Sequence, residues 1–358
     1  MNNKGFFYYE IKKGDTVYSL SNQYETSVQR IIYANPKINI YNLKIGNKII
    51  IPVGNIADTS EFYNYNKIKN DINNLKKIYP FLEIKTIGES ELNKSIYSIK
   101  IGKGNKEIFY NGSFHANELI TTNVLMKFVE DYARAFVENK KIFNYDAREL
   151  YYNTSLFVVP LVNPDGVDLV TGSLSNVDNA YQNAKIIADS FPNIPFPQGW
   201  KANINGIDLN LQFPAEWEKA KEIKYEQGFN KPAPRDFVGF GPLTAKESLA
   251  IYNYTLKHNF RLVISYHTQG QVIYWNFQNI TPPMGRKIGE QFSRVSGYRL
   301  ADVPYNSSFA GYKDWFILNY NKPGYTIEAG LGSNPIQMDQ FYKIYDDNIG
   351  ILTLGMVV

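Results

Sequence analysis

Two of the three histidines in this 358-residue chain stand where they could bind a metal ion. His115 precedes Glu118 by three residues, so a short turn can direct an imidazole and a carboxylate to one ion. Catalytic zinc takes three nitrogen or oxygen ligands and leaves a fourth position for water. With His267 as the third ligand, the candidate zinc ligands are His115, Glu118 and His267. Glu328 would then remain free to accept and return a proton.

Each of these candidates follows an apolar run that reads as a strand. Residues 106–111 precede the loop with His115, residues 262–266 precede His267, and residues 325–327 precede Glu328. Residues 118–137 carry apolar side chains near helical spacing, so a helix is expected there. Ligands in open α/β sheets bind at the carboxyl ends of the strands. The pattern therefore predicts one site at that edge of a sheet.

Taken singly, the same residues have ordinary structural explanations. Glu118 could complement a helix dipole, Glu328 could belong to a buried ion pair, and His267 could be a hydrogen-bonded core imidazole. Their joint occurrence favours the metal site. His258, at the expected end of a helix and without a second ligand nearby, is interpreted as structural.

Composition narrows the classes of protein. The chain has 38 basic and 34 acidic residues and 44% hydrophobic residues, which does not indicate a nucleic-acid-binding protein. It has no cysteine, so any metal must be held by histidine and carboxylate groups. No apolar run is long enough to span a membrane, and residues 1–4 do not resemble the start of a signal peptide. We expect a cytoplasmic or spore location, or association with the cell wall after release.

The first fifty residues form a separate pattern. A strand is expected at residues 7–11, a helix after Thr16, a second helix after Ser27 and a strand at residues 49–51. Residues 9–16, 32–36 and 45–52 resemble a LysM domain, which binds polymers that contain N-acetylglucosamine. The resemblance implies a sugar groove lined by Gly14, Asp15, Thr16 and Ile38. The alternative is a small linking domain that does not bind sugar.

The remainder of the chain alternates helical and apolar strand patterns, as in an α/β domain. Residues 54–61 are polar and are predicted to be a linker. Beyond it, a helix is expected at residues 65–78, and residues 244–247 resemble a capping box that opens a helix to about residue 257. Further strands are expected at residues 84–87, 97–101 and 156–161.

The motifs of residues 62–358 occur in an order that resembles the M14 zinc carboxypeptidase family. Within it, the likeness is to the bacterial branch that cleaves γ-D-glutamyl-diamino-acid bonds in cell-wall peptides. The resemblance implies a mixed eight-stranded sheet flanked by helices, one zinc ion, and a peptidase domain at 62–358 after a βααβ LysM domain at 1–53 and a linker at 54–61. The matching segments are the His-x-x-Glu motif and residues 163–166, 200–203, 206–214, 234–236, 242–244, 311–316 and 322–330.

The resemblance also implies roles for individual residues. His115, Glu118 and His267 match the zinc ligands, the set found in carboxypeptidase A. Glu328 matches the general base and acid. The candidate substrate-binding residues are Asn210, Lys201, Arg235, and either Tyr305 or Tyr312 as a mobile tyrosine near the scissile bond. Leu211 replaces an arginine that binds the terminal carboxylate in digestive members of the family.

The sequence thus predicts a zinc peptidase brought to peptidoglycan by its LysM unit. Two alternatives remain: a wall-binding protein whose peptidase domain is inactive, and a zinc carboxypeptidase or amidohydrolase of other specificity. The complete set of ligands with Glu328 argues against the first. The LysM unit, which favours a polymeric or wall-derived substrate, argues against the second. The sequence does not predict the oligomeric state.

Overall fold

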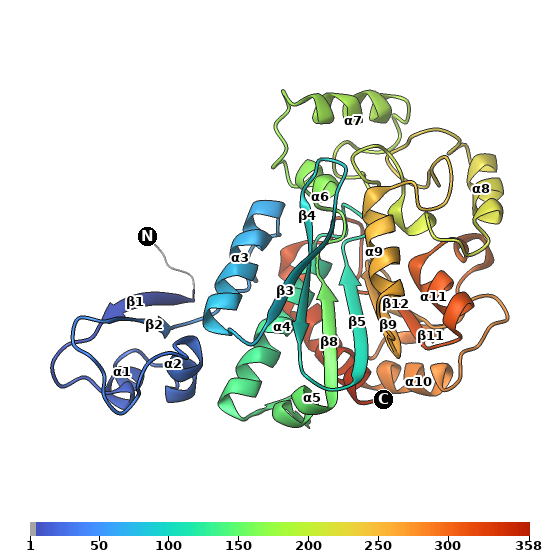
Figure 1. Cartoon of the computed structure of the whole chain (residues 1–358). Coiled ribbons are helices and arrows are strands. Elements are labelled where there is room, and N and C mark those ends of the chain that lie inside the picture. Colours follow the sequence, from blue (N-terminus) through green and yellow to red (C-terminus); the bar gives the residue numbers. More distant parts are fainter. Residues whose placement is uncertain (1–4) are drawn as a thin grey trace.

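The computed structural model describes residues 5–358, and the segment on which the signal-peptide interpretation rests, residues 1–4, lies outside them. A mixed eight-stranded sheet forms the centre of the molecule, in the order β11-β10-β12-β9-β5-β8-β4-β3, which confirms the predicted fold class (Figure 1). Its strands are β3 (Glu83–Glu89), β4 (Ser95–Ile101), β5 (Lys106–Gly112), β8 (Thr154–Val159), β9 (Leu262–His267), β10 (Val272–Tyr274), β11 (Arg299–Ala301) and β12 (Gly324–Glu328).

The four middle strands, β12, β9, β5 and β8, run parallel, and antiparallel pairs occur on both sides of them. Both faces of β8 and β9 are buried, so these strands read in the sequence as largely apolar runs. On β5, Ile108 and Tyr110 enter one hydrophobic core while Phe109 enters the other. This alternation follows from the two-residue period of a strand.

Helices cover the two faces of the sheet (Figure 1). Side chains of α3, α4, α10 and α12 join the core on one face, and those of α8, α9 and α11 join the core on the other. No helix among residues 5–358 is long and apolar enough to cross a membrane. The helices of this part are α3 (Tyr65–Ile78), α4 (Ile120–Glu138), α5 (Ala147–Asn153), α6 (Pro164–Val170), α7 (Asn179–Asp189), α8 (Trp217–Glu226), α9 (Lys246–Leu256), α10 (Gly285–Ser296), α11 (Tyr312–Tyr320) and α12 (Phe341–Val357).

The N-terminal unit lies to one side of the sheet (Figure 1). Its strands β1 (Phe6–Glu10) and β2 (Lys48–Pro52) pair antiparallel, and α1 (Val17–Gln23) and α2 (Val28–Ala34) lie between them in the chain. The hydroxyl groups of Thr16 and Ser27 accept hydrogen bonds from the first turns of these helices, as the sequence predicts. Leu20, Ile31 and Ile51 form its fully buried core.

The segment predicted as a linker is packed against the larger part of the molecule. The backbone N–H groups of Ile56 and Ala57 donate to the carboxylate of Glu130 on α4, at 2.9 and 2.8 Å. The ring of Tyr33 on α2 lies 5.9 Å from those of Phe81 and Phe136. The N-terminal unit is therefore held against the sheet domain through both the segment and α2.

The predicted capping box at residues 244–247 is wrong. α9 begins at Lys246, and the hydroxyl of Thr244 bonds to the side chain of Gln212 instead of to the helix. Glu247, expected to reach back to the cap, is fully buried and accepts hydrogen bonds from the backbone of Glu91 and the side chain of Asn203. Long-range polar contacts outweigh the local cap at this helix.

Candidate active site

The carboxyl ends of three neighbouring parallel strands form the base of the site. His267 ends β9 and Glu328 ends β12, and these two residues are direct partners across the strand pair. On the other side of β9, Gly112 at the end of β5 pairs with Tyr266. The loop that follows Gly112 carries His115 and Glu118. The three strand ends therefore meet where the sequence predicts a site.

The loop after β5 has a shape that depends on Ser113. This residue has a positive φ of 49°, and its hydroxyl bonds to the hydroxyls of Thr121 at 2.9 Å and Thr122 at 2.8 Å. The backbone N–H of Ser113 also donates to Thr121 Oγ1. Because α4 begins only at Ile120, Glu118 belongs to the loop and not to the first helical turn that we expected. The loop position leaves the Glu118 carboxylate free to turn towards His115.

The three predicted metal ligands converge on one point. His115 Nδ1 lies 2.8 Å from Glu118 Oε1, His267 Nδ1 lies 2.8 Å from Glu118 Oε2, and the two Nδ1 atoms lie 3.1 Å apart. Ligands at 2.0–2.1 Å from a tetrahedral zinc ion are about 3.3 Å from one another. All three side chains are buried. Two imidazole nitrogens and a carboxylate at these separations fit a zinc site.

A residue without a role in the sequence prediction completes this arrangement. Asp208 Oδ1 lies 3.1 Å from Nε2 of His115, on the side of the ring away from the cluster. A carboxylate at that position fixes the ring and its tautomer and makes the imidazole a better ligand. Asp208 lies in the 206–214 motif, but the sequence gives no sign that it contacts a residue 93 positions earlier.

Mutual charge governs the ionisation of these groups in the absence of metal. Burial disfavours charge on His115, but the carboxylates of Glu118 and Asp208 outweigh it and raise its pKa to about 9. Burial alone would raise the pKa of Glu118. The positive charges of the two imidazoles and Lys201 outweigh burial and hold this pKa well below the ordinary value. Burial lowers the pKa of His267. Since a histidine must be deprotonated to bind a metal, a dication would displace the proton from His115.

Glu328 lies in the wall of the same cavity without a fixed partner. No residue between 5 and 358 donates a hydrogen bond to its carboxylate or forms an ion pair with it. Burial, followed by the negative charge of Glu118, raises its pKa to about 8. A bound dication would lower this value, because it favours the charged form. The side chain can therefore change its protonation state in the neutral range, as a general base and acid requires.

The cavity has a volume of about 700 Å³ and contains the cluster, Glu328 and three of the predicted substrate-binding residues. Lys201 Nζ lies 3.6 Å from Glu118 Oε1, close to the cluster. Asn210 accepts a hydrogen bond from the backbone of Tyr312 at 3.0 Å. Arg235 is 44% exposed and pairs with Asp236 at 2.5 Å. Leu211, the neutral residue after Asn210, also lines the cavity.

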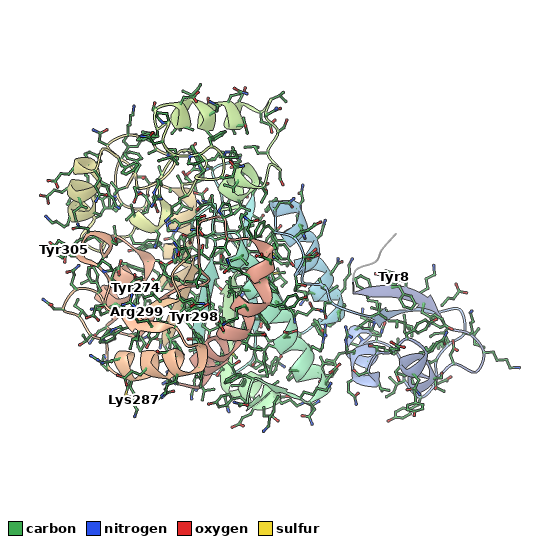
Figure 2. The ribbon with its side chains drawn as sticks, turned by 180° about the vertical axis from the view of Figure 1, so that it is seen from behind. Tyr8, Tyr274, Lys287, Tyr298, Arg299 and Tyr305 are labelled. Carbon is green, nitrogen blue, oxygen red and sulfur yellow. The ribbon has the colours of Figure 1, made fainter. Side chains whose placement is uncertain are left out.

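The two tyrosine candidates occupy different environments. Tyr312 is fully buried, and its hydroxyl lies 3.0 Å from that of Thr255 in the core beneath α9 and α11. A substrate cannot reach it there, so the expectation for Tyr312 is corrected. Tyr305 is 58% exposed, next to Pro304 and two residues before Ser307, which both line the cavity. Figure 2 shows Tyr305 at the outer edge of the large domain.

The residues predicted to bind glycan differ in exposure. Gly14 and Thr16 are exposed, while Asp15 and Ile38 are half-buried. Asp15 Oδ2 accepts hydrogen bonds from the backbone of Lys12 at 2.7 Å and the hydroxyl of Tyr9 at 2.9 Å. Its carboxylate therefore shapes the turn before α1. A role of this turn in sugar binding stays a prediction.

Known proteins resemble the chain in two regions. Residues 68–345 match the model of the zinc carboxypeptidase family M14, and residues 9–52 match the LysM domain. The chain is 44% identical over 301 residues to gamma-D-glutamyl-L-diamino acid endopeptidase 1 of Lysinibacillus sphaericus, which covers 84% of this chain and 74% of that protein.

Solved structures share the fold at low sequence identity. Bovine thrombin-activatable fibrinolysis inhibitor, bound to tick carboxypeptidase inhibitor, superposes with a TM-score of 0.62 and 16% identity, over 84% of this chain and 97% of that one. Carboxypeptidase A from Helicoverpa armigera superposes with a TM-score of 0.59 and 17% sequence identity, over 94% of this chain and 81% of that one. This chain therefore belongs to the M14 family of zinc carboxypeptidases and carries a LysM domain at its N-terminus.

Proposed function

We propose that this metallopeptidase hydrolyses the bond between γ-D-glutamate and a diamino acid in the stem peptides of peptidoglycan. The observation that carries the proposal is that the catalytic cavity is intact in a chain that is 44% identical to a gamma-D-glutamyl-L-diamino acid endopeptidase. The cavity retains the complete ligand cluster and Glu328. An inactive wall-binding protein has no need of either feature.

The charges around the cavity suit such a substrate. A γ-linked glutamate retains its own α-carboxylate at the other end of its side chain from the scissile bond, and Lys201 is a cation next to the cluster. We propose that Lys201 and Arg235 bind this carboxylate or the developing oxyanion, since charge-assisted hydrogen bonds are the stronger ones. Leu211 lacks the charge with which digestive carboxypeptidases bind a terminal carboxylate. Ordinary peptides with a free C-terminus are therefore poor substrates in this proposal.

Each chemical role falls to a group in the cavity. Zinc, when bound by His115, Glu118 and His267, acts as a Lewis acid and lowers the pKa of a water molecule. Glu328 accepts a proton at its carboxylate and transfers it to the amine nitrogen that leaves. Asp208 holds the ring of His115 through Nε2. The cavity walls orient the peptide.

We propose that residues 1–53 act as the glycan-binding unit and residues 62–358 as the peptidase, joined by residues 54–61. In Figure 2, Tyr8 on the N-terminal unit and Tyr305 beside the cavity lie at opposite sides of the molecule. The LysM unit would then retain the enzyme on the glycan without forming part of the catalytic cavity. Such a role is consistent with action at the cell wall or the spore.

The test is to offer L-Ala-γ-D-Glu-meso-diaminopimelate and a plain peptide with an aromatic C-terminus side by side. We expect cleavage after γ-D-glutamate, identified by mass spectrometry, and weak or no release of the aromatic residue. The variant Glu328→Gln serves as the control for a contaminating peptidase. Preference for the aromatic peptide would contradict the proposal and indicate a carboxypeptidase. Cleavage of neither peptide would favour the inactive alternative.

A further inference from the structure

The carboxylate that holds the ring of His115 belongs to a segment without regular secondary structure. Asp208 Oδ1 lies 3.1 Å from Nε2 of His115, and residues 190–208 form no helix or strand. The other carboxylate oxygen of Asp208 accepts a hydrogen bond from the backbone of Asp236 at 3.3 Å. The place of Asp208 therefore depends on the hydrogen bonds that shape the segment leading to it.

Asn203 closes this segment into a loop shortly before Asp208. Its Oδ1 atom accepts hydrogen bonds from the backbone N–H groups of Asn205 at 3.1 Å and Ile207 at 3.0 Å. Its own backbone N–H donates to the carbonyl oxygen of Ile207, and its carbonyl oxygen accepts from the ring nitrogen of Trp200. Asn203 is fully buried. One side chain thus sets the direction in which the chain enters Asp208.

The amide nitrogen of Asn203 is held from outside the loop. Nδ2 donates to Oε2 of Glu247 at 3.3 Å, and Oε1 of Glu247 accepts from the backbone of Glu91 at 3.2 Å. An amide group can turn over and exchange its oxygen for its nitrogen, but only one orientation gives the loop its acceptor and Glu247 its donor. Glu247 therefore fixes which atom of Asn203 faces the loop.

The anchor itself is part of the packed sheet domain. Glu247 lies in the first turn of α9, and Glu91 lies between β3 and β4. A Cβ atom at Gly88 on β3 would lie 2.4 Å from Cβ of Ala250 on α9, so strand and helix are in close contact. Figure 1 shows the β3–β4 hairpin beside α9. The irregular loop thus takes its position from two regular elements.

We propose that Asn203 and Glu247 are positioning residues that hold Asp208 against His115 and thereby strengthen zinc binding. The proposal rests on the zinc site of the proposed function and names the residues that support it from behind. Neither Asn203 nor Glu247 lines the cavity, so neither contacts the substrate or the metal. Partners that orient a metal-binding histidine are worth about 10- to 100-fold in metal affinity or activity, so a displaced Asp208 has a measurable effect.

The zinc affinity of the full-length protein, measured by competition with a chelator and without substrate, tests the link. Asn203→Ala removes the acceptor for Asn205 and Ile207 and should weaken zinc binding by about 10-fold. Asn203→Asp keeps this acceptor and should retain most of the affinity. At pH 7 Glu247, whose pKa burial raises to about 8, can donate its proton to the new carboxylate. Wild-type affinity in Asn203→Ala overturns the proposal.

A substitution of Asp208 separates positioning from a general loss of structure. Asp208→Ala removes the contact with His115 and should itself weaken zinc binding by about 10- to 100-fold. If Asn203 acts through Asp208, Asn203→Ala should cause little further loss in the Asp208→Ala protein, because the two changes interrupt the same chain of contacts. An equal further loss in that protein would show that Asn203 does not act through Asp208, and would overturn the proposal.

Glu247→Gln tests the anchor with a side chain of the same size. The amide of the new residue can accept from either Asn203 or Glu91 but turns a donor towards the other, so zinc binding should weaken, though less than in Asn203→Ala. Glu130→Gln is the matched control, because Glu130 is also fully buried and accepts two backbone N–H groups but does not line the cavity. Its zinc affinity should not change. An equal effect in the two variants overturns the role of Glu247.

The outcomes also separate this proposal from the one on which it rests. Zinc binding is measured without a peptide, so a wild type that fails to cleave γ-D-glutamyl peptides refutes the proposed specificity and not the link. A wild type that binds no zinc refutes both. Melting temperatures of the metal-free variants show whether a loss of affinity arises from unfolding. If Asn203→Ala does not fold, the comparison of Glu247→Gln with Glu130→Gln decides.

Discussion

The catalytic cavity and the predicted sugar groove place their polar groups in opposite environments. In the cavity, His115, Glu118 and His267 are buried and each depends on the others for its charge state. In the LysM unit, Gly14 and Thr16 are exposed to solvent. Removing the partner of a buried charge costs about 3–5 kcal/mol, whereas a single exposed polar contact contributes about 1 kcal/mol or less. Single changes should therefore have large effects in the cavity, and the LysM unit should act as a whole.

The largest expected effect is that of His115→Ala. Its Nδ1 faces the cluster, so the variant should lose most of its zinc and nearly all peptidase activity. His258→Ala is a matched control, because within residues 5–358 the ring of this third histidine has a hydrogen bond only with Glu107, away from the cavity. It should retain both properties. Zinc content and turnover, measured on the same preparations, check the comparison. Full zinc and full turnover in His115→Ala would place the site elsewhere.

A second substitution separates proton transfer from metal binding. Glu328→Gln keeps the shape of the side chain but cannot accept a proton, so turnover should fall about a hundredfold or more. Zinc content should remain near that of the wild type, because Glu328 does not belong to the cluster. Loss of zinc together with activity would instead make Glu328 a ligand.

A third prediction concerns a buried carboxyl group outside the cavity. Burial, followed by the charges of Glu91 and Asp165, raises the pKa of Glu247 to about 8. Between its ordinary pKa and this value the folded state holds the extra proton, so the contribution to stability is present at low pH and lost as pH rises through 8. From pH 5 to pH 9 the wild type should lose on the order of 4 kcal/mol relative to Glu247→Gln.

Denaturant unfolding of both zinc-loaded proteins at several pH values measures this difference. A difference between the two proteins that is constant with pH would show that Glu247 titrates near its ordinary value. Asn203, which donates to Glu247, lies in the motif that precedes Asp208, so the result also reports on the support of the cavity.

The smallest effect on catalysis is expected from removal of the LysM unit. Deletion of residues 1–53 keeps Ile56 and Ala57, which donate to Glu130, so cleavage of small soluble muropeptides should change little. Binding to intact sacculi should fall, because the unit acts through effective concentration. Cosedimentation with sacculi measures the binding. Equal sedimentation of the truncated chain would show that LysM does not target the enzyme. Deletion also exposes Phe81 and Phe136, so the melting temperature is the necessary control.

Local patterns in the sequence were enough to predict several elements. The helix expected at residues 65–78 is α3, and the strands expected before His115, His267 and Glu328 are β5, β9 and β12. Buried parallel strands are continuous apolar runs, and a helix has a 3.6-residue period, so both are visible within one short segment. The short strands β10 and β11 and the helices α11 and α12 lack such clear patterns and were not predicted. α10 was also not predicted, although Ile288, Phe292 and Val295 give it an apolar face at helical spacing.

The amino-acid sequence by itself determined which residues can bind zinc and which carboxylate remains for proton transfer, because these depend on side-chain chemistry and on strand ends. Only the tertiary structure decided their partners. It brought Asp208 to His115, buried Tyr312, and linked Asn203 to the buried Glu247. The physical reason is that burial and charge pairing arise between segments distant in the chain, and no local pattern records which segments will meet.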